Sequence, residues 1–116
     1  MSVALVLGIG VIGGAGAIAR FLLDGAVSQR VGGRFPWGTL AVNASGSFLL
    51  GVVAGAVEGD AYRLLATGLL GAYTTFSTWM LESHRLGEDG RLRLGAANFA
   101  LSLAVGLVAV WIGRQL

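Results

Sequence analysis

The chain has 116 residues, of which 55% are hydrophobic and only 12% are charged, and its mean hydropathy is +0.78. Soluble globular domains carry about 25% charged residues, so this composition excludes an ordinary soluble domain and is typical of a membrane protein. There is no cysteine, which excludes disulfides and thiolate metal sites, and the net charge of +2 comes from arginines that flank apolar runs, where lipid headgroups rather than nucleic acid are the expected partners.

Four stretches are near the length of about 20 residues that a helix needs to cross a bilayer. We predict spans at residues 2–23, 36–57, 62–83 and 93–114, within one all-α transmembrane domain that covers residues 1–116. The first stretch lacks the basic n-region and clear cleavage site of a signal peptide, so we interpret it as a retained helix. The predicted connections are a loop at residues 24–34, a short turn at 58–60 and a solvated loop at 82–93.

Arginine counts give a hypothesis for orientation in the membrane. The first and third loops share one side of the membrane, and Arg63 and Arg114 are on the other. The loop side carries the larger number: Arg30, Arg34, Arg85, Arg91 and Arg93. This bias favours both termini outside. It is modest, and the third loop also carries acids, so insertion in both orientations stays open.

Small residues recur at helical spacing and predict faces that contact protein instead of lipid, because they let helices approach closely. The second span carries Thr39, Asn43, Ser47, Gly51 and Gly55; the first carries Gly10, Gly13, Gly16 and Ala17; the fourth carries Gly95, Asn98, Ser102 and Gly106. The same packing explains "GIGVIG" at residues 8–13, which fits a dinucleotide-binding pattern but lacks the acidic residue and the alternating strands that such a site requires.

Few polar groups lie at membrane depth, and they indicate anion chemistry. They are Arg20, Asn43, the Thr and Ser cluster at residues 74–78, Asn98 and Ser102. No carboxylate lies well inside a predicted span, whereas cation pathways and proton-coupled exporters usually place one there. The Asn43 amide and the hydroxyls can replace water around a small anion, and the electropositive edges of Phe76 and Trp79, three residues apart, can face it.

The stretch "GLLGAYTTFSTWM" at residues 68–80 predicts a break in the third span. Gly71 precedes two consecutive β-branched hydroxyl residues, a combination that favours an unwound turn whose free carbonyls could bind a cation. For any single Ser or Thr, a hydrogen bond to the carbonyl four residues back is the simpler explanation. Arg20 is either a vestibule charge that attracts anions or the partner of Asp24, and the lone His84 is an interfacial side chain rather than a metal ligand.

The motifs "GGAGAIAR", "GTLAVNASGSFLLG", "GLLGAYTTFST" and "NFALSLAVGL", one in each predicted span, resemble the Fluc (CrcB) fluoride channels. The resemblance implies a passive, fluoride-selective channel in the cell inner (plasma) membrane. It implies an antiparallel dual-topology dimer with two pores and a structural sodium ion at the interface. By this resemblance Gly71 and Thr74 supply sodium-binding carbonyls, and Arg20 is the vestibule charge. The fluoride pathway comprises Asn43, Phe76, Trp79, Ser77, Thr78 and Ser102.

Two departures from the family pattern stand out. Trp79 occupies a position where the family usually has phenylalanine, and its larger indole adds an N–H donor. Gly106 removes a hydroxyl one turn beyond Ser102.

If the orientation of the chain in the membrane is fixed, the partner is an oppositely inserted paralogous chain instead of a second copy. The rival functions are a small four-helix exporter, which lacks its embedded glutamate, and a non-conducting assembly subunit. An enzyme is excluded for want of a nucleophile, base and metal set.

Overall fold

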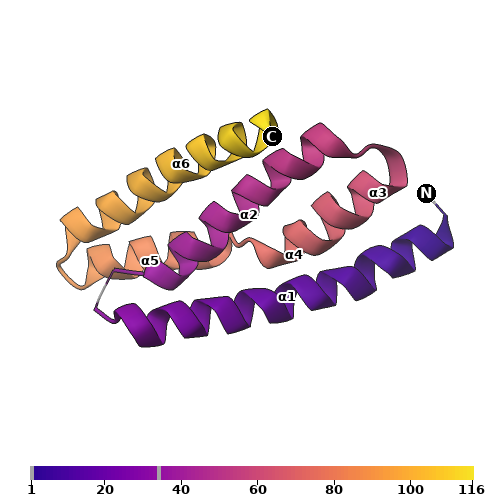
Figure 1. Ribbon diagram of the computed structural model, residues 1–116. Coiled ribbons are helices and arrows are strands. Elements are labelled where there is room, and N and C mark those ends of the chain that lie inside the picture. Colours follow the sequence, from indigo (N-terminus) through magenta and orange to yellow (C-terminus); the bar gives the residue numbers. More distant parts are fainter. Residues whose placement is uncertain (1, 34) are drawn as a thin grey trace.

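The computed structural model describes residues 2–33 and 35–116 as an elongated, all-helical bundle measuring 49 × 28 × 24 Å (Figure 1). The long elements run antiparallel to their neighbours in the chain, and the broken third segment lies beside the first helix. The elements are α1 (Val3–Val31), α2 (Trp37–Ala56), α3 (Gly59–Tyr62), the π-helix η1 (Arg63–Leu70), α4 (Gly71–Tyr73), α5 (Ser77–Glu88) and α6 (Leu92–Gln115). Of these, α1, α2 and α6 are long and apolar enough to cross a membrane.

Two helices extend well beyond the predicted spans, so the connections are shorter than expected. The Ser2 hydroxyl caps α1 by accepting the Leu5 N–H at 3.1 Å, and the helix continues to Val31, where Gly32 ends it with a φ of 65°. The predicted loop at residues 24–34 is therefore mostly helical, and Arg34 lies outside the described residues. Likewise α5 continues to Glu88, and Gly90 turns the chain at a φ of 77°. No proline interrupts either extension, and Gly25 and Gly87 within them do not end the helices. Falling hydropathy marks only where a span leaves the lipid, not where its helix ends.

The third predicted span is interrupted, as its sequence predicts. Instead of one helix, the chain forms α3, η1, α4 and α5 in succession, and Figure 1 shows the ribbon change direction between α4 and α5. Thr74 is extended, with φ −78° and ψ 162°, and the helix resumes at Ser77. The wider π-helical turns end at Leu70, one short turn of α-helix before the break. Such local changes of helix type often occur at functional sites.

The faces of small residues contact protein, which confirms their predicted role. A Cβ added at Gly51 on α2 would overlap the Val110 carbonyl of α6, and one at Gly95 on α6 would lie 2.7 Å from the Ser83 carbonyl of α5. Gly113, which is outside the predicted face of α6, leaves room for the Phe48 carbonyl of α2 in the same way. On α1, Gly16 leaves room for the Leu69 carbonyl of η1 in the same way. Gly10 is the exception, because the space beside it is open for at least 4 Å.

The distribution of buried and exposed side chains is that of a membrane protein. Among the described residues, fully or nearly buried polar side chains include Thr39, Asn98 and Ser102. Large apolar side chains such as Val11, Phe21 and Leu107 are instead more than half exposed on the surface. Polar groups at membrane depth need protein partners, whereas apolar side chains are stable against lipid. The buried polar side chains therefore lie between the helices, where they can form hydrogen bonds with protein groups.

Candidate functional site at a helix break

Asn43 closes the break in the third segment from the neighbouring helix. Its Nδ2–H donates to the Thr75 carbonyl and its Oδ1 accepts the Thr75 N–H, each at 2.8 Å. The side-chain amide thus pairs with both backbone groups of Thr75, as an adjacent peptide group would. Because Asn43 lies in α2 and Thr75 lies between α4 and α5, this pair fixes the position of the break against the intact helix.

Two backbone amides are diverted from their usual helical partners at the break. In a continuous α-helix the N–H groups of Thr75 and Thr78 would bond the carbonyls of Gly71 and Thr74. Here the Thr75 N–H bonds Asn43, and the Thr78 N–H donates to the Thr75 hydroxyl at 3.2 Å. The carbonyls of Gly71 and Thr74, which the family resemblance implies as sodium ligands, are therefore released from these helical bonds. The Thr74 hydroxyl itself bonds the Leu70 carbonyl at 3.0 Å, four residues back.

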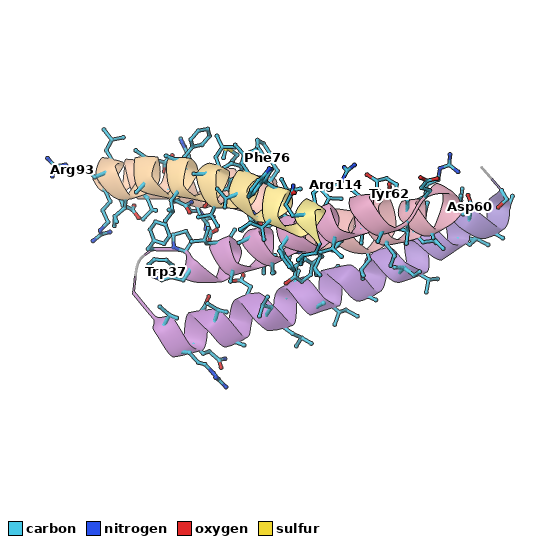
Figure 2. The ribbon with its side chains drawn as sticks, turned by 45° about the horizontal axis from the view of Figure 1, so that its top comes forward. Trp37, Asp60, Tyr62, Phe76, Arg93 and Arg114 are labelled. Carbon is cyan, nitrogen blue, oxygen red and sulfur yellow. The ribbon has the colours of Figure 1, made fainter. Side chains whose placement is uncertain are left out.

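A groove of 390 Å³ lies beside the break, between α2, the broken segment and α6. Six predicted site residues line it: Asn43, Gly71, Thr74, Phe76, Trp79 and Ser102. Phe76 is 68% exposed, and Figure 2 places it between the end marked by Arg93 and the end marked by Asp60 and Tyr62. Among the residues that the structure describes, no Asp, Glu, Lys or Arg lines the groove. Its polar groups are uncharged hydrogen-bonding side chains and backbone.

The groove also shows which predicted residues lie elsewhere. Ser77 and Thr78 are outside its lining, and Ser77 is exposed at the start of α5. Arg20 lies on α1, away from the groove, and makes no ion pair within the described residues; its Nε is buried without a hydrogen-bond partner. The alternative pairing with Asp24 is not formed, since Asp24 Oδ1 instead accepts the Ser28 hydroxyl at 3.2 Å. His84 pairs with Glu88 at the exposed surface.

Three residues outside the predicted fluoride pathway and sodium site contribute to this region. Thr75 supplies the backbone groups bound by Asn43 and caps the Thr78 N–H, and its spacing three residues before Thr78 is the spacing of a helix cap. Ser47 lines the groove, and its hydroxyl lies 3.5 Å from the place where a Cβ at position 106 would stand. Phe99 stacks on Trp79, with ring centroids 5.4 Å apart, a contact that no pattern within one helix predicts.

Residues 7–114 match the family model described as "CrcB-like protein, Camphor Resistance (CrcB)". The chain belongs to the CrcB family. A protein of Mycolicibacterium paratuberculosis named fluoride-specific ion channel FluC 2 is 50% identical over 116 residues, which cover 99% of this chain and 95% of that relative. A CrcB relative from Symbiobacterium thermophilum, named fluoride-specific ion channel FluC 1, is 48% identical and covers 93% of each chain. One from Geobacter sulfurreducens, named fluoride-specific ion channel FluC, is 43% identical over 93% of this chain and 92% of its own.

Proposed function

We propose that this CrcB protein is a fluoride-selective channel that lets fluoride leave the cytoplasm passively across the inner membrane. The observation that carries the proposal is the uncharged groove at the helix break, where hydrogen-bond donors lie beside the exposed Phe76 ring. A small anion recovers its lost hydration from a few short hydrogen bonds, whereas chloride, larger and a weaker acceptor, gains less from them. The names of its relatives support the same function.

The hydrogen-bond inventory of the groove indicates which donors an anion would meet. An asparagine amide carries two N–H groups, and Asn43 uses one of them on the Thr75 carbonyl, which leaves the second for a ligand. The Ser102 hydroxyl donates to Asn98 Oδ1 at 3.3 Å, longer than a good O–H···O bond, so its proton is easily redirected. The Thr74 hydroxyl is engaged at 3.0 Å with Leu70. Asn43 is therefore the strongest donor candidate, with Ser102 second.

We propose that the chain crosses the membrane four times and pairs with an oppositely oriented partner. The segment from α3 to α5 supplies the fourth crossing, as a broken helix beside α1, α2 and α6. One chain leaves the groove open on one side, and Phe76 and Leu107 in its lining are 68% and 61% exposed. A second copy in antiparallel orientation, or a paralogous chain, would enclose this lining and complete two pores.

A sodium ion at the interface is a further part of the proposal, as a structural cofactor. The carbonyl oxygens of Gly71 and Thr74 lose the amides that would occupy them in a helix, and hard cations prefer such oxygen ligands. Two broken segments from an antiparallel pair would double this ligand set. A dimer prepared without sodium is expected to lose conduction or assembly. Unchanged flux and assembly from protein shown to hold no sodium would contradict this role.

The decisive experiment is fluoride efflux from liposomes that contain the purified protein, with chloride efflux recorded in parallel. We expect rapid fluoride loss without chloride loss, and a strong reduction for Phe76→Ala in protein that still folds and assembles. A matched control is Phe21→Ala, which truncates a ring that is 76% exposed on the surface of α1. An assembly subunit would release neither ion. Equal release of fluoride and chloride would contradict selectivity in this groove.

A further inference from the structure

The indole of Trp79 on α5 contacts the rings of Phe76 and Phe99 and donates a hydrogen bond to a backbone carbonyl of α6. Its ring centroid lies 5.7 Å from that of Phe76, with the planes at 89°, and 5.4 Å from that of Phe99, with the planes at 20°. The indole Nε1–H donates to the Asn98 carbonyl at 3.2 Å. Phe76 and Trp79 line the groove, whereas Asn98 and Phe99 on α6 are outside its lining.

Hydrogen bonds connect Trp79 and Asn98 in a closed ring. The Ser83 hydroxyl donates to the Trp79 carbonyl at 2.9 Å and accepts the Asn98 Nδ2–H at 2.8 Å, while Trp79 returns a bond to Asn98 through its indole. Asn98 is completely buried, and its remaining amide oxygen accepts the Ser102 hydroxyl. A buried and satisfied network of this kind fixes the relative position of its members, because any rotation leaves a polar group unpaired.

We propose that Asn98 and Phe99 are positioning residues that clamp the Trp79 ring in one orientation within the wall of the fluoride pathway. This inference rests on the proposed function. The clamp occupies the indole N–H, so Trp79 contributes a fixed aromatic wall instead of a hydrogen bond to the anion. A phenylalanine at this position would keep a ring but could not make the bond to Asn98. In this chain the tryptophan is therefore tied to its own neighbours on α6.

The first test measures the motion of the ring directly. The double variant Trp37→Phe and Trp111→Phe leaves Trp79 as the only tryptophan, and its time-resolved fluorescence anisotropy reports local rotation. We expect Trp79 to show almost no fast depolarisation, and Phe99→Leu in this background to introduce it. Phe21→Leu, on the exposed surface of α1, is the matched control and is expected to change nothing. A Trp79 that rotates freely in the double variant, in which Asn98 and Phe99 are unchanged, would overturn the proposal.

The second test asks whether the clamp acts on permeation. Fluoride efflux is measured for Trp79→Phe, for Phe99→Leu and for the two combined, with Trp111→Phe as the control for a tryptophan replacement outside the groove. Aromatic contacts of this kind correspond to changes of about 2- to 10-fold in rate. We expect each single variant to slow fluoride by that amount and the combination to be no slower than the slower single variant. Multiplied effects in the combination, or no effect in either single variant, would overturn the clamp.

The two tests separate this inference from the function on which it rests. If liposomes with the wild-type protein release no fluoride, the proposed channel is contradicted. The anisotropy of Trp79 would still test the clamp, because that measurement does not depend on fluoride flux. Rapid fluoride release together with a mobile Trp79 would keep the channel and reject the clamp.

Discussion

Helix α2 meets two neighbours in different ways. Against α6 it packs backbone to backbone, because Gly51 and Gly113 leave room for the carbonyls of Val110 and Phe48. Against the broken segment it presents the Asn43 amide, which makes two bonds of 2.8 Å to Thr75. An intact membrane helix makes all of its backbone hydrogen bonds internally, so a neighbouring helix needs only room to approach it. A broken helix has unpaired backbone groups and requires a hydrogen-bonding partner at the same depth in the membrane. Replacing each kind of contact therefore has a different expected cost.

The largest effect is expected from Asn43→Leu, which removes the partner of the break. It leaves the Thr75 N–H and carbonyl without their bonds, each at a cost of about 1–3 kcal/mol, so the combined loss is about 2–6 kcal/mol. We expect a clearly lower unfolding temperature in detergent together with loss of fluoride efflux. Gln115→Leu, which removes an amide from the exposed end of α6, is the matched control. Wild-type stability in Asn43→Leu would show that the break does not depend on this amide.

A smaller effect is expected from Gly113→Ala, which tests the contact that requires only space. The new methyl group would overlap the Phe48 carbonyl, so α2 and α6 must separate, at a cost of about 1–3 kcal/mol in the free energy of unfolding. Gly14→Ala makes the same change where the space is open for at least 4 Å, and stability should stay the same or rise by up to about 1 kcal/mol. Thermal unfolding of both proteins gives the comparison. Equal losses would show that close approach is not what Gly113 provides.

The sequence predicted the broken segment and the glycine faces because both depend on local pattern. Gly71 followed by two β-branched hydroxyl residues disfavours a continuous helix, and residues four apart share one face of any helix. The partner of Asn43 was not predictable in this way, because it depends on which helix packs beside the break. The end of α1 at Val31 was missed for another reason: hydropathy measures where a helix leaves the lipid, and the helix continues beyond that point until Gly32.

The smallest effect is expected from Thr75→Val, which separates the side chain of Thr75 from its backbone. The change removes the hydroxyl that accepts the Thr78 N–H, a capping bond worth about 1 kcal/mol, but keeps both backbone groups that Asn43 binds. Thr78→Val is the matched control, because it leaves the Thr78 N–H and its acceptor in place. We expect the unfolding temperature of Thr75→Val to fall below that of Thr78→Val but to stay well above that of Asn43→Leu. If Thr75→Val were instead as damaging as Asn43→Leu, the cap at the start of α5, and not the amide from α2, would hold the break open. The released carbonyls of Gly71 and Thr74 would then depend on the third segment alone.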